Sequence, residues 1–571
     1  MQSDTALVLL DVVLALVFLW LAWSVLRPSR ASPPGPKGLP FVGVAYEIPG
    51  DKQWLKFHEW TLRYGRCLWR PIAVRIPEML RYERLTRTAS TFMRVLSPHD
   101  GALSMNSIFT DIGGDVVSTT VMGQPTLILG SVRAANDLLD NRGAIYSDRP
   151  DAIMAGELVG WNRGLGYAHG PDNPRFREFR RLFQQFIGPR ACQHRHILSM
   201  QEEETHRLMF RFLRDPENFY RHPRESTGAL ILRLAYGYEV VEDQGQDPLV
   251  QVVEVAMQGF AKASEPGAFL VDNFPVLRYV PEWLMPGGGF KAVSRRMRRE
   301  LDEMYDLPFG FVKEQLEAGK ARPSFTSSYL EEKRGPTAAD EELIKAAAAS
   351  LYSGGADTTP SSMTAFILAV TLQPSIQARA QRELDAVLGS SWTRLPTFAD
   401  RERLPYVNAI VLEVLRWNPA VPLGLAHRVT QDDVYRGWVI PKGTVVWANI
   451  WSMLQDPAVF PEPSEFRPER YLNADGSLRE LERHEDPSII GFGFGRRICP
   501  GMFFAMNSIF IGIATMLYVF DISKSRHEND EEIVPKVDFR GFISHPVPFK
   551  CDIRPRSEEA AALVRRATGQ D

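Results

Sequence analysis

The sequence predicts a mainly α-helical domain with minor β sheets, preceded by one N-terminal transmembrane helix. An apolar run occupies residues 6–26, long helical patterns fill the second half of the chain, and β-branched runs with turn residues are few and short. The 571 residues are 44% hydrophobic and 24% charged, with a formal net charge of -3. This near-neutral balance gives no reason to expect a nucleic-acid partner.

The N-terminal run ALVLLDVVLALVFLWLAWSVL (6–26) is close to the ~20 apolar residues that a helix needs to span a bilayer. A cleaved signal peptide is the alternative, but the preceding residues MQSDT carry an acid and no base, whereas signal peptides begin with positive charge. Basic residues follow the run, which places the rest of the chain in the cytosol. We therefore predict a retained single-pass anchor (1–30) and a stiff, proline-rich connector (31–45).

The body, 46–558, is expected to form one domain, followed by a tail over 559–571. In chain order the patterns predict a β-hairpin over 115–129 around a Gly-Gln-Pro turn, helical structure over 175–213, one long helix over 341–372, another helix over 401–417, short strands over 434–449 and a strongly apolar helix over 499–520. Because the apolar helix follows a charged loop and is interrupted by Asn507 and Ser508, we expect it to be buried in the core.

One segment does not fit a compact domain. Residues 66–114 contain seven arginines, no lysine and three prolines, without clean periodicity. We interpret this segment as a translated intron, with a genuine surface insertion as the alternative. A spliced transcript that still encodes it would end the first interpretation.

The four cysteines form no C-x-x-C pair, so zinc ribbons and ordinary iron–sulfur clusters are poor interpretations. Cys499 lies in the glycine-rich segment FGFGRRICPG (492–501) at the start of the apolar helix. Backbone N–H groups and the helix dipole favour a thiolate there, and Arg497 supplies a cation suited to a carboxylate. A shielded thiolate is a good axial ligand for haem iron, whereas a purely structural cysteine is the alternative.

This segment matches the signature F-x-x-G-x-R-x-C-x-G of the cytochrome P450 family at Phe492, Gly495, Arg497, Cys499 and Gly501. The chain resembles this family over nearly all its length and is most similar to fungal, particularly basidiomycete, members. The resemblance implies the cytochrome P450 fold and haem b (iron protoporphyrin IX) as cofactor. It also implies that the sulfur of the signature cysteine is the axial ligand of the iron.

Other motifs follow in the order of the family. Glu413 and Arg416 form an E-x-x-R pair on one helical face, although many solvated helices carry such a pair. The resemblance adds Arg470 as the third member of a network that stabilises the scaffold. It also implies that Asp357 and Thr358, beside two helix-weakening glycines, relay protons to iron-bound dioxygen. A kinked helix with a solvated acid is the alternative.

Arginines are expected to hold the haem carboxylates, because a guanidinium pairs bidentately with a carboxylate. By resemblance these are Arg180, Arg428 and Arg497. Phe176-x-x-x-Arg180 stands in the place of the family's W-x-x-x-R, with phenylalanine replacing tryptophan. The arginines around Arg180 also fit a solvated basic face, which in this family receives the electron donor.

These features predict a monooxygenase of the endoplasmic reticulum membrane. It would insert one oxygen atom of dioxygen into a lipophilic small molecule of secondary metabolism: a terpenoid, steroid, polyketide or aromatic compound. The chain has no P-loop, no G-x-G-x-x-G after a strand and no flavin domain. Electrons from NADPH are therefore expected through a separate NADPH–cytochrome P450 reductase. A reductase-independent isomerase or dehydratase and a non-catalytic haem-binding protein are the alternatives.

The resemblance also implies an apolar substrate pocket, with walls from 422–426, 541–544 and Ala356. The stretch 269–290 is rich in apolar residues. We predict that it dips into the membrane surface and forms part of an entry route for substrates, against the alternative of ordinary packing.

Overall fold

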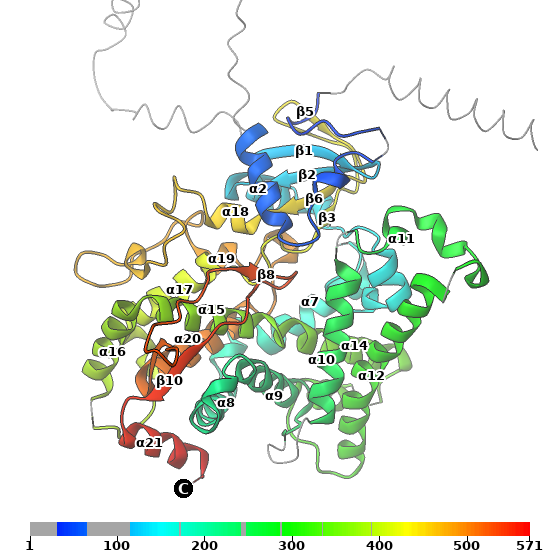
Figure 1. Cartoon of the computed structure of the whole chain (residues 1–571). Helices are drawn as coiled ribbons and strands as arrows, with labels where there is room; N and C mark the ends of the chain where they lie inside the picture. Colours follow the sequence, from blue (N-terminus) through cyan, green and yellow to red (C-terminus); the bar gives the residue numbers. More distant parts are fainter. Residues whose placement is uncertain are drawn as a thin grey trace, which may run out of the picture.

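The computed structural model describes residues 31–40, 42–64, 115–170, 173–240, 247–265, 267–285, 288–333, 335–389 and 391–570. The predicted anchor over 1–30 and the doubtful segment over 66–114 lie outside the described residues, and both stay predictions. The described chain is mainly helical with small sheets, as the sequence predicts (Figure 1).

The α-helices range from single turns to one long helix near the centre of the chain. They are α2 (Gln53–Tyr64), α5 (Val132–Ala135), α6 (Gly143–Tyr146), α7 (Pro174–Ile187), α8 (Arg195–Arg214), α9 (His222–Tyr236), α10 (Pro248–Ser264), α11 (Leu270–Asn273), α12 (Gly289–Glu317), α13 (Phe325–Glu332), α14 (Ala338–Gly355), α15 (Thr358–Leu372), α16 (Pro374–Leu388), α17 (Pro405–Trp417), α18 (Ile450–Leu454), α19 (Pro487–Ile490), α20 (Met502–Val519) and α21 (Glu558–Thr568).

The strands form one four-stranded sheet and three small pairs. They are β1 (Val116–Val121), β2 (Gln124–Leu129), β3 (His427–Arg428), β4 (Asp433–Tyr435), β5 (Trp438–Ile440), β6 (Val445–Ala448), β7 (Phe520–Lys524), β8 (Phe539–Arg540), β9 (His545–Pro546) and β10 (Cys551–Pro555). The larger sheet has the order β1-β2-β6-β3 and lies at one end of the molecule, beside α2 (Figure 1). The pairs are β4 with β5, β8 with β9, and β7 with β10.

The predicted hairpin over 115–129 is confirmed as β1 and β2, which pair antiparallel with Val121 opposite Gln124. The turn itself is shifted from the predicted Gly-Gln-Pro. It consists of Met122 and Gly123, both with positive φ, because a two-residue hairpin turn of this hand matches the twist of the strands.

The apolar helix α20 forms the centre of the helical core, where it packs against α8, α15 and α17. Among the residues that the structure describes, it is the one helix long and apolar enough to cross a membrane, but 72% of it is buried inside the protein. The expectation that this helix belongs to the core is therefore confirmed. It also fixes the position of Cys499, which lies three residues before its first turn.

Two expectations about the helices are wrong. The predicted helix over 341–372 is two helices, α14 and α15, which are interrupted at Ala356 and Asp357. Pro360 contributes to this break, since proline has no N–H to donate to the preceding turn. The predicted tail over 559–571 contains the helix α21, which packs against α8 and buries its apolar face of Ala560, Ala561, Leu563 and Val564.

Candidate active site

A cavity of about 370 Å³ lies between α7, α14, the start of α20 and the loops that follow α17 and β8. Its walls are mostly apolar, and several large side chains contribute to them: Trp161, Phe176, Leu351, Phe504 and Ile543. The predicted walls over 422–426 and 541–544 contribute Leu423, Gly424, Leu425, Phe542 and Ile543. Ala356, which was also predicted, is not among the lining residues; its neighbours Gly354 and Gly355 are.

The Cys499 side chain lines this cavity from the loop before α20. The loop is tight: the Cys499 N–H donates to the carbonyl of Phe492 at 2.9 Å. Gly495 has a φ of 61°, and a Cβ there would lie 2.0 Å from the carbonyl oxygen of Leu139. No other residue fits at this position without moving the backbone, which explains the glycine of the signature.

Burial and two polar neighbours act in opposite directions on Cys499. Burial raises the pKa of its thiol, whereas the Gly501 N–H and the Arg180 guanidinium lower it, with a net shift upward. A bound metal ion deprotonates a coordinating thiol outright, so iron itself would have to supply the missing stabilisation.

Three arginines, Arg149, Arg180 and Arg497, and one histidine, His427, line the same cavity. No carboxylate is found among the lining residues that the structure describes. Burial is the largest influence on the pKa of Arg149, lowering it to about 9, and on that of Arg497, lowering it to about 10. An apolar cavity with uncompensated cations and one thiol fits haem b, whose carboxylates would pair with the arginines.

Backbone carbonyls hold two of these arginines in place. Arg180 donates to the carbonyl of Ile498 at 2.7 Å, beside the cysteine. Arg497 donates to the carbonyls of Ser147 and Ala168, both at 2.7 Å. The Arg497 guanidinium also lies 4.0 Å above the ring centre of Phe176, so the phenylalanine that replaces the family's tryptophan still supports a cation.

The structure does not place Arg428 at the cavity. Its guanidinium pairs with Asp148 at 2.6 Å and with Asp151 at 2.7 Å. His427, the preceding residue on β3, lines the cavity instead, because successive strand residues point to opposite faces. His427 is buried and its pKa falls to about 3, chiefly through burial and secondarily through Arg149.

Asp357 and Thr358 point in different directions from the break between α14 and α15. Thr358 lines the cavity, and its hydroxyl donates to the Gly354 carbonyl at 3.0 Å. Asp357 is not a lining residue and lies beside Arg224 and His545. Burial alone would raise the pKa of Asp357, but these two partners outweigh it, so that the pKa lies below the ordinary value.

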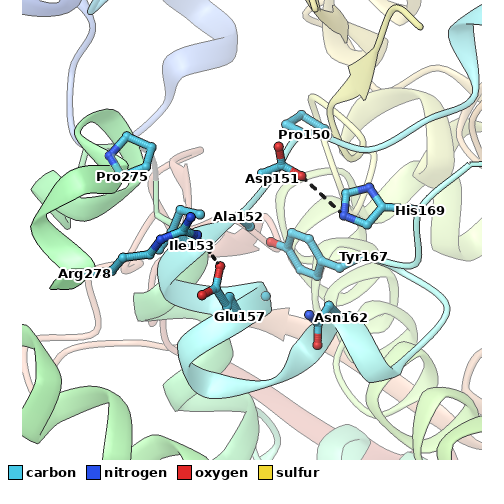
Figure 2. Close-up of a pocket in the computed structure, with 11 residues that line it drawn as sticks. Pro150, Asp151, Ala152, Ile153, Glu157, Asn162, Tyr167, His169, Pro275 and Arg278 are labelled. Carbon is cyan, nitrogen blue, oxygen red and sulfur yellow. Dashed lines mark hydrogen bonds and ion pairs between the residues drawn. The ribbon is translucent and has the colours of Figure 1, made fainter.

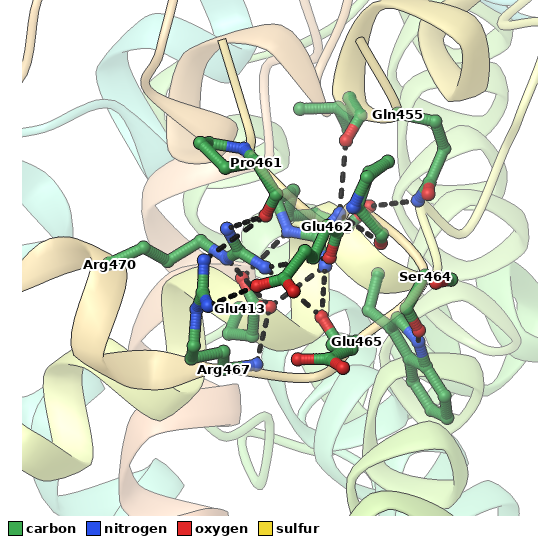
Figure 3. Close-up of polar contacts among 12 residues, drawn as sticks. Glu413, Gln455, Pro461, Glu462, Ser464, Glu465, Arg467 and Arg470 are labelled. Carbon is green, nitrogen blue, oxygen red and sulfur yellow. Dashed lines mark hydrogen bonds and ion pairs between the residues drawn. The ribbon is translucent and has the colours of Figure 1, made fainter. Parts of the chain in front are cut away.

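Glu413, Arg416 and Arg470 form one charged network (Figure 3). Glu413 and Arg416 are fully buried and form two parallel bonds of 2.7 and 2.8 Å. Arg470 donates to the same carboxylate at 3.1 Å, and the Arg467 N–H donates to it at 2.7 Å. The remaining donors of Arg416 and Arg470 reach carbonyls of the loop over 461–465, which ties this loop to α17.

A second cavity of about 270 Å³ lies beside the first and is more polar (Figure 2). His169 and Asp151 meet across it at 3.3 Å, and Arg278 bonds Glu157 at 2.7 Å. Tyr167 lines both cavities, and its hydroxyl donates to Ser264 at 2.9 Å. The two cavities therefore share Tyr167 as a wall residue.

Sequence reasoning missed Arg149, Tyr167 and His427. Arg149 lies in the segment RGAIYSDRP, and its Nη1 donates to the carbonyls of Leu425 and Ala426 at 2.7 Å. This segment resembles the corresponding segment of fungal members of the family, and that likeness was the available signal. Nothing in the local pattern indicates that Arg149 is buried.

The fold and the site together indicate a protein of the class that binds haem through a cysteine thiolate. The family model described as cytochrome P450 matches residues 96–553, so the chain belongs to this family. The chain is 42% identical to cytochrome P450 monooxygenase 208 of Postia placenta, over 97% of either chain. It is 40% identical to cytochrome P450 monooxygenase claR of Ampulloclitocybe clavipes, over 99% of this chain and 94% of that protein.

A further relative is the tryptamine 4-monooxygenase of Psilocybe cyanescens, which is 36% identical over 94% of this chain and 95% of its own length. These relatives support the fungal, basidiomycete character that the sequence suggested. The chain is a cytochrome P450 monooxygenase, and haem b is its expected cofactor.

Proposed function

We propose that this monooxygenase inserts one oxygen atom from dioxygen into a neutral, lipophilic small molecule, with electrons from NADPH delivered by a separate reductase. The observation that carries this proposal is the apolar cavity, which is lined by the Cys499 thiol and by three arginines, with no carboxylate among the described lining residues. Bound haem supplies the chemistry of dioxygen activation, with the cysteine thiolate pushing electron density towards iron.

The protein side chains divide the remaining tasks. Arg180 and Arg497 are proposed to hold the haem carboxylates, together with Arg149 in the place first assigned to Arg428. The Thr358 hydroxyl faces the cavity and is the group positioned to pass a proton into it. Asp357, on the far side of the helix break, is proposed as the acid that supplies this proton.

The electron donor is proposed to be NADPH–cytochrome P450 reductase. A separate donor is favoured because these 571 residues show no nucleotide-binding motif after a strand. Several arginines of α7, among them Arg177 and Arg181, form a basic face suited to an acidic partner.

The charged groups that line the cavity limit which substrates can bind. An ammonium substrate would meet no carboxylate among the described lining residues, because the haem carboxylates are taken up by the arginines. The name of the Psilocybe relative contains tryptamine, an aromatic amine. For this chain we expect the neutral alcohol tryptophol to bind more tightly than tryptamine. An unpaired buried charge costs several kcal/mol, so the difference should exceed about tenfold. Spectral titration of the purified haem protein with both compounds measures it; equal affinities or a preference for tryptamine would contradict this substrate class.

Reconstitution tests the function itself. The full chain, co-expressed with a fungal reductase, should oxidise members of a neutral lipophilic panel at the expense of NADPH. Under oxygen-18 gas, one labelled atom should appear in each product molecule. A product that forms without reductase and without label would identify an isomerase or dehydratase instead.

We propose that the body is docked on the endoplasmic reticulum membrane by the predicted anchor and by an exposed apolar patch. The patch extends from α11 to the turn after it, and its members are Leu270, Phe274, Val276, Tyr279, Trp283 and Leu284. Trp283 and Tyr279 are 82% and 72% exposed. Pro275 and Arg278 from the same stretch line the second cavity, which supports an entry route from the membrane side.

Removing the aromatic part of this patch should weaken membrane binding. In an anchor-deleted form, Tyr279→Ser with Trp283→Ser is expected to lower partitioning onto vesicles by about tenfold or more, since each buried aromatic ring contributes ~1.5–3 kcal/mol. Flotation with phosphatidylcholine vesicles measures this. Val534→Ser is the matched control, because Val534 is 64% exposed and lies outside the patch. Unchanged partitioning of the double variant would contradict the docking proposal.

A further inference from the structure

Asp357, Arg224 and His545 form a closed triad next to the helix break. The Arg224 Nε and the His545 Nε2 each lie 3.1 Å from Oδ1 of Asp357. The Arg224 Nη2 lies 3.3 Å from the same histidine nitrogen. Both contacts of the carboxylate fall on Oδ1, so they leave Oδ2 as the oxygen that can carry a proton.

The local sequence frees Asp357 for this role. Asp357 is the residue that precedes α15, a position where an aspartate side chain normally caps the first N–H groups of the helix. Here the side chain makes no capping bond. One reason is that Pro360, the third residue of the helix, has no N–H to offer. The carboxylate is held instead by a histidine from a distant segment.

His545 is itself held on a rigid support. The preceding residue, Ser544, accepts bonds at its carbonyl from Ser361 at 2.6 Å and from Asn418 at 2.9 Å. Its hydroxyl donates to Asn418 at 2.7 Å and its N–H donates to Ala420. This clamp joins the segment to α15 and to the loop after α17, so the backbone that carries His545 is fixed by several buried bonds.

The same segment forms part of the cavity wall. Phe542 and Ile543 line the cavity, and the clamp residue Ser544 separates them from His545. Residues 542–545 therefore carry both the side chains that line the cavity and the histidine that contacts Asp357. This arrangement positions the carboxylate relative to the bound substrate and not only relative to its own helix.

Among the charged and titratable groups around His545, Asp357 is the nearest anion. Arg224 comes from α9 and is 43% exposed, so water reaches this side of the triad. Tyr220 donates its hydroxyl to the Pro546 carbonyl. Arg540 lies opposite His545 in the β8–β9 pair and is paired with Asp538. The Nδ1 of His545 is buried and meets no partner among the described residues, so Nε2 is the nitrogen that acts.

We propose that His545 is a positioning residue for proton delivery, which fixes Asp357 through Oδ1 and leaves Oδ2 to carry the proton. The inference rests on the proposed function, in which Asp357 supplies protons towards the cavity. In each delivery the Asp357 carboxylate takes a proton from water at the exposed side of Arg224, passes it on towards the cavity and returns to its ionised form. No electron moves in this step, and the imidazole stays in place.

The test compares two ways of driving the full-length haem protein with one probe, ethoxycoumarin. Turnover with NADPH and reductase requires protons to be delivered to dioxygen, whereas turnover with cumene hydroperoxide does not. His545→Leu is expected to lower the NADPH-driven rate by about tenfold, the worth of one hydrogen bond to a charged group, and to leave the peroxide-driven rate within about twofold. His545→Gln, whose amide can still donate to Oδ1, should recover most of the loss.

His527→Leu is the control, since His527 is exposed and its side chain lies outside the triad. An equal fall of both rates in His545→Leu would identify a merely structural residue and overturn the proposal, as would an unchanged NADPH-driven rate. If the unaltered protein oxidises the probe with peroxide but not with NADPH and reductase, that result contradicts the proposed function itself and not the role of His545.

A second measurement judges the triad without turnover. Thermal unfolding of the haem protein is compared for His545→Leu, Asp357→Asn and the double variant. Groups in direct contact are not independent, so the loss of Tm in the double variant should be clearly smaller than the sum of the two single losses. Additive losses would show that the histidine does not act through Asp357.

Discussion

Replacement of Cys499 by serine is expected to abolish NADPH-driven turnover and to remove the haem-thiolate spectrum. The cavity and its arginines would remain, because serine is close to cysteine in size and its oxygen can still accept from the Gly501 N–H. A serine hydroxyl keeps its proton and gives iron no thiolate sulfur, so the electron push needed for dioxygen cleavage is lost. A fall of about a thousandfold corresponds to ~4 kcal/mol of barrier. Product analysis and the haem content of the purified variant measure the two effects.

Cys551→Ser provides the matched control. Cys551 lies on β10, and it is absent from the residues that line the cavity. The same exchange of sulfur for oxygen there should leave haem content and turnover close to those of the unaltered protein. Persistent turnover in Cys499→Ser would overturn the assignment of the axial ligand.

Replacement of Glu413 by glutamine should have the largest effect on stability. Arg416 is fully buried, and the carboxylate that compensates its charge would be gone. Removing one partner of a buried pair costs ~3–5 kcal/mol, a large part of a typical folding free energy of ~5–15 kcal/mol. We expect the variant to accumulate in smaller amounts than the unaltered protein, with a larger haem-free fraction. Urea unfolding, followed by circular dichroism, measures the change in the free energy of unfolding.

Glu203→Gln tests whether the loss depends on burial. Glu203 bonds Arg233 at 2.7 Å, but its side chain is half exposed. Exposed pairs contribute only ~0–1 kcal/mol, so this variant should unfold close to the unaltered protein. Similar losses in both variants would mean that the buried network is no more important than a surface ion pair.

The sequence allowed those parts of the site to be predicted that lie within one short segment. The loop of Cys499, with the glycine at 495, and the Glu413–Arg416 pair are each set by residues close in the sequence, and the structure shows the tight loop and the bonded pair. Thr358 likewise lines the cavity from the weakened helix. In each case the residues that determine the geometry are neighbours in the chain.

The parts that could not be predicted depend on register and on distant contacts. Whether His427 or Arg428 faces the cavity is decided by a two-residue strand, and a shift of one residue exchanges the two faces. Arg149 and His545 reach the site from segments whose local patterns do not show where they pack. The helix α21 was interpreted as a tail because its apolar face becomes visible only against α8.

The most direct test of the whole account is the absorption spectrum of the purified, dithionite-reduced protein under carbon monoxide. We predict a Soret band at the long-wavelength position that distinguishes thiolate-ligated from imidazole-ligated haem. A band at the imidazole position, or protein that carries no haem after expression with haem supplementation, would contradict the assignment of Cys499 and with it the proposed chemistry.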